Sequence, residues 1–153
     1  MSRLSVVLPA YNEELMVGKT CRVLKEVLTD AGISYELVLV DDGSADHTWQ
    51  EIEKAGKTDP WITGVRFSRN FGKEAAITAG LAHSSGAVVA VMDCDLQHPP
   101  DTLVEMYRLW EKGFQVVEGI KTNRGKESFF HKKSAGLFYR IMSRATGVDM
   151  ANA

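Results

Sequence analysis

Short apolar runs alternate along the chain with longer segments of helical periodicity. The runs are rich in valine, isoleucine and leucine and predict buried strands at 4–8, 35–40, 62–67 and 88–92. In the segment 17–28 the apolar side chains recur instead at roughly helical spacing. Strands that alternate with helices predict an α/β fold, in which helices cover both faces of a mostly parallel sheet.

The ends of the remaining elements follow from local residue chemistry. Asn12 is a good N-cap for the first helix, and Ser44 or Asp46 can cap the helix that follows the second predicted strand. A further helix over about 101–112 and a short strand over 115–118 complete the predicted core. The helix after the third strand is rich in alanine and glycine, which predicts that it lies close to the sheet.

Polar clusters follow each of the four predicted strands. They are Tyr11 with Glu13, Asp41 with Asp42, Arg69 with Lys73, and Asp93 with Asp95. Ligands of open parallel sheets bind outside the carboxyl ends of the strands, so the four clusters predict one binding site. The chain has neither a G-x-G-x-x-G motif after the first strand nor a Walker loop, which leaves dinucleotide and P-loop sites without their motifs.

The stretch from Val88 to Asp101 carries the clearest chemistry. Asp93, Asp95 and Gln97 stand at alternate positions, and in an extended chain their side chains would share one face. Hard oxygen ligands suit Mg²⁺ or Mn²⁺, so the stretch predicts a metal and diphosphate site. The alternative is that Asp95 and Asp101 merely cap the next helix.

Composition adds few constraints. The 153 residues suffice for one domain with a hydrophobic core, and the two cysteines, Cys21 and Cys94, form no disulfide framework, which favours a reducing compartment. No signal peptide or membrane-spanning run is visible, and nothing indicates a nucleic-acid partner.

Charge is distributed unevenly. Residues 1–120 hold 11 basic and 18 acidic side chains, a net of −7, whereas residues 121–153 hold 7 and 2, a net of +5. Such asymmetry predicts a basic element that faces an anionic partner. The segment 128–145 is predicted to be helical, with one apolar face (Phe130, Leu137, Phe138, Ile141) edged by Lys133, Arg140 and Arg144. It is interpreted either as a membrane-surface helix or as a core-packing helix with a solvated basic edge.

Four short motifs, in their order and spacing, carry a resemblance to a known family. They are PAYNE at 9–13, VDDGS at 40–44, RNFGK at 69–73 and DCDLQHPP at 93–100. The chain resembles glycosyltransferase family 2, which has the Rossmann-like GT-A fold. Within that family it is most similar to polyprenyl-phosphate glycosyltransferases, such as dolichol-phosphate mannose synthase and its bacterial undecaprenyl-phosphate relatives.

The resemblance implies a role for each matched position. The nucleotide site would comprise Pro9, Ala10, Tyr11, Glu13, Asp41, Asp42, Lys73 and Asp93, with Asp42 on the base. Mg²⁺ or Mn²⁺ would be held by Asp93, Asp95 and Gln97, and the two aspartates would be the catalytic residues. Arg124 with Lys132 or Lys133 would meet the acceptor phosphate.

The implied reaction is metal-dependent transfer of a sugar, with inversion, from a nucleotide diphosphate sugar to a polyprenyl phosphate. Residues 1–118 would form the nucleotide-sugar-binding core, and 119–153 a basic loop and amphipathic helix that begin the acceptor half near the membrane. The full-length protein is then expected in the cytoplasm, at the inner face of the membrane. The chain is expected to be a fragment, and its exposed apolar helix face predicts self-association into a homo-oligomer.

Three alternatives stay open. A relative from the same family could use a hydroxyl acceptor or make a polymer, and would then need a general base. A nucleotidyltransferase would also use carboxylates and Mg²⁺. A phospho-receiver module could be phosphorylated at Asp93, but in that fold the paired acids follow the first strand, and here they follow the second.

Overall fold

The computed structural model of the chain describes residues 3–119, which form a parallel sheet with helices on both faces. The strands are β1 (Leu4–Ala10), β2 (Tyr35–Asp41), β3 (Ile62–Arg66) and β4 (Val88–Val91). The helices are α1 (Val17–Asp30), α2 (Thr48–Thr58), α3 (Lys73–His83) and α4 (Asp101–Glu111). Strand and helix alternate strictly, as the hydrophobic pattern predicts.

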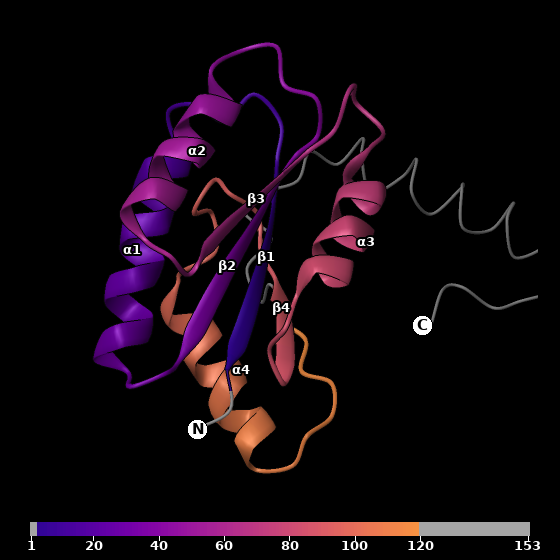
Figure 1. The fold of residues 1–153 in the computed structure, drawn as a ribbon. Helices are drawn as coiled ribbons and strands as arrows, with labels where there is room; N and C mark the ends of the chain where they lie inside the picture. Colours follow the sequence, from indigo (N-terminus) through magenta and orange to yellow (C-terminus); the bar gives the residue numbers. More distant parts are fainter. Residues whose placement is uncertain (1–2, 120–153) are drawn as a thin grey trace, which may run out of the picture. The chain divides into compact units, whose positions relative to one another are not determined.

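The four strands are hydrogen-bonded in the order β3-β2-β1-β4, and all three pairings are parallel. Leu4 pairs with Tyr35 on one side and with Val88 on the other. The parallel register brings the carboxyl ends of all four strands to the same edge of the sheet (Figure 1). Each polar cluster of the sequence therefore emerges at that edge.

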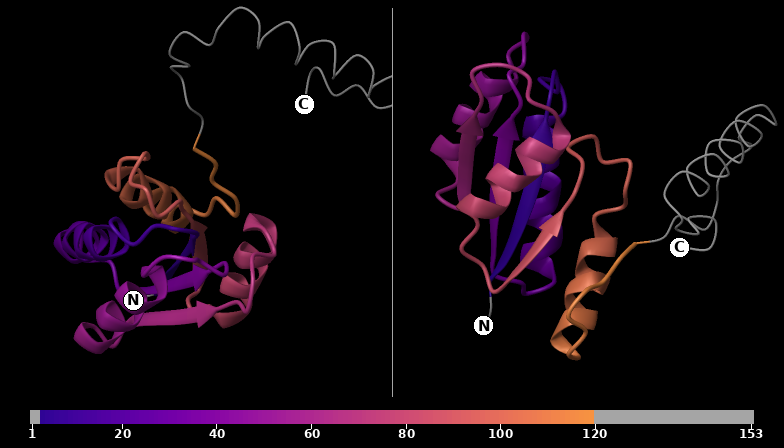
Figure 2. Two further views of the ribbon diagram at one scale, coloured as in Figure 1. Left: turned by 90° about the horizontal axis from the view of Figure 1, so that it is seen from above. Right: turned by 90° about the vertical axis from the view of Figure 1, so that its right-hand side faces the viewer.

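Three helices cover one face of the sheet and one covers the other. α1, α2 and α4 lie on one side, whereas α3 lies alone on the opposite side (Figure 2). The central strands β1 and β2 are almost wholly buried between the two layers. Their continuous apolar composition is what burial on both faces requires.

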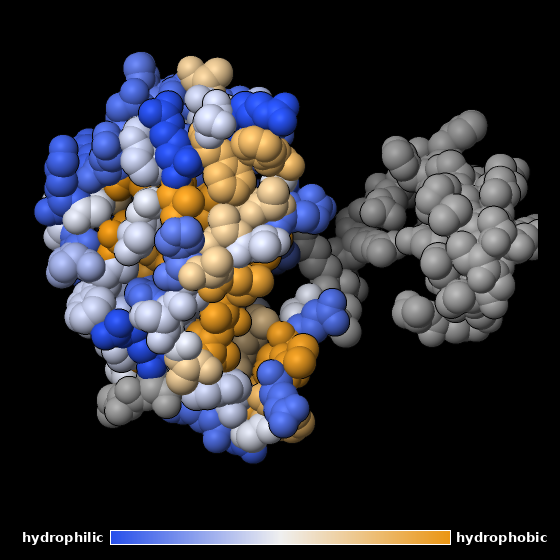
Figure 3. Space-filling model, turned by 45° about the vertical axis from the view of Figure 1, so that its right-hand side comes forward, coloured by the Kyte–Doolittle hydropathy of each residue, from blue (hydrophilic) through white to orange (hydrophobic). Residues whose placement is uncertain are grey.

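The larger part of the core lies between the sheet and the helices α1, α2 and α4. Its fully buried members include Val6, Leu8, Val17, Leu24, Leu28, Leu37, Leu39 and Ile52. On the α3 side hydrophobic side chains gather in an exposed band (Figure 3). Leu81, Val89 and Val91 are large apolar residues of α3 and β4 that remain substantially exposed. Val89 and Val91 stay exposed because α3 packs over β1 and β2 and not over β4.

Several predicted boundaries need correction. Asn12 does not cap α1, which begins at Val17; it adopts the left-handed region at φ 55° instead. The predicted strand at 115–118 is absent, and these residues are irregular. No helix within residues 3–119 is long and apolar enough to cross a membrane. The predicted helix at 128–145 lies outside the described residues, and the division of the chain after residue 118 stays a prediction.

Candidate functional site

The structure brings all four polar clusters together at the carboxyl edge of the sheet. The backbone N–H of Asp42 donates to the carbonyl of Ala10, and that of Phe67 donates to the carbonyl of Asp41, each at 2.9 Å. The Lys73 ammonium lies 2.5 Å from a carboxylate oxygen of Asp93. Residues from four separate loops thus form one continuous rim.

The loops after β1 and β2 are held together by reciprocal hydrogen bonds. Asn12 donates its backbone N–H to Ser44 Oγ at 2.9 Å, and its own Oδ1 accepts from the N–H of Ala45 at 3.0 Å. The next N–H, that of Glu13, donates to Thr48 Oγ1 at 2.8 Å. The side chain of Asn12 therefore ties two loops of the site together, which explains its departure from the predicted capping role.

The two neighbouring aspartates at the end of β2 are both buried but face different partners. Asp42 accepts from the backbone N–H groups of Phe71 and Gly72, at 2.7 and 3.0 Å. Asp41 is fully buried; one oxygen accepts from the N–H of Ser44, while Oδ2 accepts no hydrogen bond and lies 3.5 Å from Arg66 Nε. Each carboxylate oxygen has two lone pairs, so the oxygens of Asp42 retain capacity for a ligand donor.

The loop before α3 lies directly against the loop after β2. A Cβ on Gly43 would stand 2.3 Å from the carbonyl carbon of Arg69, and Gly43 has a positive φ of 70°. A side chain at this position would collide with backbone, so the close approach requires glycine. Together with the hydrogen bonds to Asp42, this contact fixes the backbone that leads into Lys73.

After β4 the chain turns instead of continuing as an extended strand. β4 ends at Val91, and Leu96 takes a positive φ of 56°. The N–H of Gln97 donates to Asp95 Oδ1 at 3.0 Å across this turn. The premise that Asp93, Asp95 and Gln97 alternate along an extended chain was therefore wrong, because side-chain hydrogen bonding favours a turn here.

The capping interpretation of this stretch was also wrong. Pro100 occupies the N-cap position of α4, which has no side-chain cap hydrogen bond, and Asp101 is simply an acidic residue in the first turn. Between the turn and the core, Cys94 is buried and its carbonyl accepts from Thr20 Oγ1 at 2.7 Å. This hydrogen bond anchors the turn to α1.

Negative charge dominates one part of the rim. The pKa of Glu13 is raised by partial burial and, in decreasing order, by the charges of Asp95, Asp46 and Asp93. These four carboxylates, from three different loops, therefore share one electrostatic field. A concentration of negative charge of this kind favours a bound cation.

Asp46 is the member of this group that sequence reasoning treated only as a capping residue. Its oxygens accept from the backbone N–H and hydroxyl of Thr48 and from the N–H of Glu14. Burial opposes ionisation, but these hydrogen bonds outweigh it and lower the pKa of Asp46. Its place two residues after the VDDGS motif was a signal for a role at the rim.

The predicted metal ligands can be tested against the chemistry of the donors present. Asp93, Asp95 and Gln97 supply hard oxygen atoms at a solvent-accessible rim. No group of three or more His, Cys, Asp or Glu side chains within residues 3–119 is arranged to hold a metal ion. Mg²⁺ in phosphate-transfer sites usually takes one or two carboxylates and completes its shell with water and substrate phosphates. The residues fit an ion that binds together with a diphosphate.

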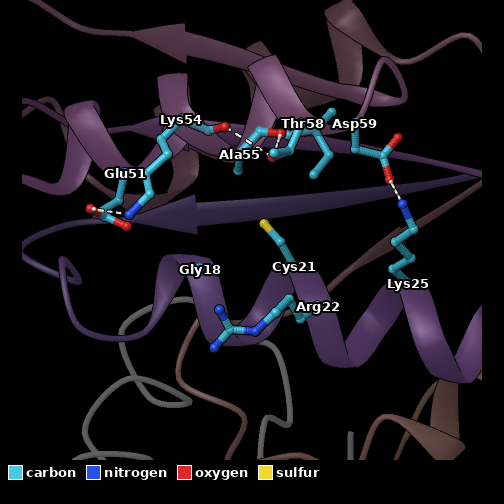
Figure 4. A pocket seen from close by; sticks show the side chains of 10 residues that line it. Gly18, Cys21, Arg22, Lys25, Glu51, Lys54, Ala55, Thr58 and Asp59 are labelled. Carbon is cyan, nitrogen blue, oxygen red and sulfur yellow. Dashed lines mark hydrogen bonds and ion pairs between the residues drawn. The ribbon is translucent and has the colours of Figure 1, made fainter.

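A cavity of about 300 Å³ lies elsewhere, between α1 and α2 (Figure 4). Cys21 and Ala55 contribute to its lining. An ion pair between Lys25 and Asp59 lies at one end, and an ion pair between Lys54 and Glu51 within α2 lies at the other. Burial raises the pKa of Cys21 to about 11, so this thiol is unreactive at neutral pH. No lining residue belongs to the four clusters, and the cavity is therefore separate from the candidate site.

The predicted acceptor residues Arg124, Lys132 and Lys133 lie outside the described residues, and their role stays a prediction. Tyr11 is exposed at the rim, while Pro9 and Ala10 end β1 below it. The described part of the site therefore comprises residues 9–13, 41–46, 69–73 and 93–97.

Comparison with known proteins agrees with the motif pattern. The model of the family described as glycosyl transferase family 2 matches residues 5–151. The uncharacterised glycosyltransferase YkcC of Bacillus subtilis is 42% identical over 95% of this chain and 45% of its own length. The undecaprenyl-phosphate 4-deoxy-4-formamido-L-arabinose transferase of Salmonella paratyphi B is 33% identical over 99% of this chain and 46% of its own length.

A solved structure shares the fold. The mannosyltransferase PcManGT of Pyrobaculum calidifontis, in complex with GDP-mannose and Mn²⁺, superposes with a TM-score of 0.58 at 26% identity, over 70% of this chain and 32% of that one. The predicted GT-A fold is confirmed. The chain spans less than half the length of the curated relatives it matches.

Proposed function

The chain belongs to glycosyl transferase family 2, and on that basis we propose that it binds the donor of an enzyme that transfers a sugar from a nucleoside diphosphate sugar to a polyprenyl phosphate. The observation that carries this proposal is the meeting of four motifs at the carboxyl edge of one parallel sheet. The 33% identity to an undecaprenyl-phosphate sugar transferase favours a polyprenyl phosphate as the acceptor.

The nucleotide would lie along the rim formed by the first three loops. Asp42 would accept a hydrogen bond from the base, while Pro9, Tyr11 and Glu13 would border the same pocket. Asp41, whose Oδ2 accepts no hydrogen bond among the described residues, would hold the site in shape through Arg66. Lys73 would contribute its positive charge to the diphosphate.

Asp93, Asp95 and Gln97 would hold Mg²⁺ or Mn²⁺ next to the diphosphate. When bound, such an ion neutralises the negative charge that develops on the departing nucleoside diphosphate. The structure with GDP-mannose and Mn²⁺ supports this cofactor for the fold, and the acidic field around Glu13 supports it for this chain.

The reaction needs no strong general base. The bond between the anomeric carbon and the donor diphosphate breaks, and a bond to an oxygen of the acceptor phosphate forms on the opposite face of the sugar. A phosphate monoester has a second pKa near about 6, so its oxygen is already ionised at neutral pH. Positive charge is needed instead to offset repulsion between the two phosphate groups, and Arg124, Lys132 and Lys133 are proposed to supply it. A polyprenyl phosphate acceptor would place the reaction at the cytoplasmic face of a membrane.

The test is a donor screen followed by a transfer assay. Isothermal titration calorimetry with UDP, GDP, ADP and CDP in the presence of Mn²⁺ should identify one preferred base with micromolar affinity. Radiolabelled sugar donors with that base are then supplied with a polyprenyl phosphate or with a hydroxyl acceptor of similar chain length. Transfer to the hydroxyl acceptor alone would replace the proposed acceptor class, and metal-dependent release of pyrophosphate from a nucleoside triphosphate and a sugar phosphate would indicate a nucleotidyltransferase. Absence of binding to every nucleotide would contradict the proposal.

A further inference from the structure

The ion pair between Lys73 and Asp93 links the first residue of α3 to the turn after β4. Its two atoms are 2.5 Å apart, and the side chains are 54% and 39% exposed. An ion pair this exposed contributes little to folding, because solvent screens the attraction and two long side chains lose freedom. The pair can therefore open at small cost when either partner finds a stronger counter-charge.

The position of Lys73 does not depend on this pair. The N–H groups of Phe71 and Gly72 are held by Asp42, and the backbone of the same loop is packed against Gly43. Gly72 is the N-cap of α3 and Lys73 its first residue, so the helix also fixes the start of this side chain. If Asp93 binds another partner, the Lys73 ammonium group therefore still lies at the rim, because its backbone is fixed.

Asp93 lies in the most negative part of the site. Partial burial and, in decreasing order, the charges of Asp95, Asp46 and Asp93 raise the pKa of Glu13. Among the described residues, Lys73 is the cation recorded in contact with this group of carboxylates. Lys73 thus pairs with the carboxylate of Asp93, which a divalent cation would need as a ligand.

We infer that Lys73 is a resident counter-ion which Asp93 exchanges for the divalent metal when the donor diphosphate arrives, so that metal and nucleotide bind cooperatively. The inference rests on the proposed function, since it takes the diphosphate and the metal as the ligands of this rim. Without nucleotide, the ammonium competes with the metal for Asp93. With nucleotide present, the diphosphate offers Lys73 a new anionic partner and leaves Asp93 to the metal. Lys73 is thus a positioning residue whose charge couples the two binding events.

The test compares Mn²⁺ binding with and without nucleotide in wild type and in Lys73→Met. Methionine keeps the length and apolar stem of lysine and removes the charge. Free Mn²⁺ is measured by electron paramagnetic resonance, first with the metal alone and then with a saturating concentration of the preferred nucleoside diphosphate. We expect Lys73→Met to bind Mn²⁺ alone about tenfold more tightly, because a positive charge a few ångströms from the ion is gone. The nucleotide should then raise its metal affinity by a smaller factor than in wild type, and the metal should raise its nucleotide affinity by the same reduced factor.

Lys54→Met is the matched control. Lys54 also pairs with a carboxylate, that of Glu51 at 3.6 Å, but it lies on α2 beside the cavity, outside the four clusters. The metal affinity of this variant should stay within about twofold of wild type, since solvent and salt screen an exposed charge outside the site. Lys73→Arg should keep the cooperativity of wild type.

The outcomes separate this inference from the proposed function. Equal Mn²⁺ affinities in wild type and Lys73→Met, or an equal gain in affinity in Lys54→Met, would overturn the counter-ion role. Failure of every variant to bind any nucleoside diphosphate would contradict the proposed function, yet the metal-only comparison would still decide whether Lys73 competes for Asp93.

Discussion

Gly80 of α3 lies against Val7 of β1 so closely that a Cβ on Gly80 would stand 2.3 Å from Cγ1 of Val7. Both residues are buried, and Val7, on the central strand β1, is completely so. Glycine therefore sets the distance between α3 and the strand beneath it. Because α3 begins at Lys73, the same distance sets where that side chain reaches the rim.

Gly80→Ala should destabilise the fold by about 1–3 kcal/mol, because the added methyl group overpacks the interface with Val7. The result runs against helix propensity, which favours alanine over glycine by about 1 kcal/mol. Urea denaturation followed by circular dichroism measures the change. Gly18→Ala, in α1, is the control: its nearest atom would be Glu51 Oε2 at 3.6 Å, an ordinary contact, so it should be neutral or slightly stabilising. If the clash is the cause, Gly80→Ala should cost less stability in a Val7→Ala background than in wild type, which a double-mutant cycle measures.

The alternation of strands and helices could be predicted because burial on two faces imposes a strong pattern on β1 and β2. The close approach of α3 to the sheet could be predicted from the small residues of this helix. The extra strand predicted at 115–118 was wrong, since a short apolar run has no fixed structure without a neighbour to pair with.

The site was harder to predict because its side chains bind partners far away in the sequence. Asn12 has the chemistry of a helix cap, yet it bonds to Ala45 in another loop. Asp95 follows a strand, yet it closes a turn with Gln97. Motif order placed each residue at the correct edge of the sheet, but only the folded loops decide which backbone groups each carboxylate meets.

Asp42→Ala should lower the free energy of unfolding by about 2 kcal/mol in addition to any effect on ligand binding. The buried carboxylate accepts from the N–H groups of Phe71 and Gly72, and its removal leaves both donors without a protein partner. Chemical denaturation checks the prediction, with the exposed Asp30→Ala as a control that should change stability by less than about 0.5 kcal/mol. An Asp42→Ala protein as stable as wild type would mean that the loop before α3 is held without this carboxylate.

Glu36 should make the fold sensitive to acid. Its side chain is 13% exposed, and it accepts from Ser5 Oγ, from Ser85 Oγ at 2.8 Å, and from the backbone N–H groups of Ser85 and Gly86. Burial opposes ionisation, but these hydrogen bonds outweigh it and lower the pKa of Glu36. The stabilisation of the fold by the Glu36 carboxylate is therefore complete above the pKa of a glutamate in the unfolded chain, about 4.3. It is lost as the pH falls through the lower pKa of Glu36 in the folded chain.

Glu36→Gln separates this carboxylate from the other acids of the fold. The variant should be less stable than wild type at pH 7, since the amide nitrogen would face N–H donors. The difference in free energy of unfolding between wild type and Glu36→Gln should narrow between about pH 5 and pH 3, because wild type loses the stabilisation by the Glu36 carboxylate there. Urea midpoints across that range measure it, and Glu105→Gln, an exposed position on α4, should follow wild type at every pH. A constant difference at all pH values would show that Glu36 keeps an ordinary pKa.

Asp95→Asn should weaken Mn²⁺-dependent binding of a nucleoside diphosphate by about tenfold or more, because an ion with few protein ligands loses one of its anionic ones. The substitution is conservative for the fold: an asparagine Oδ1 can still accept the N–H of Gln97, so the turn is expected to persist. Calorimetry with and without Mn²⁺ makes the measurement, and nucleotide affinity without metal should stay nearly unchanged. Asp101→Asn removes the same charge six residues further on, where the side chain is exposed and forms no capping hydrogen bond, and should leave the metal-dependent affinity as in wild type. Equal metal-dependent affinities in wild type and Asp95→Asn would remove Asp95 from the ligand set, and Asp93 would then be the remaining carboxylate of the predicted metal site.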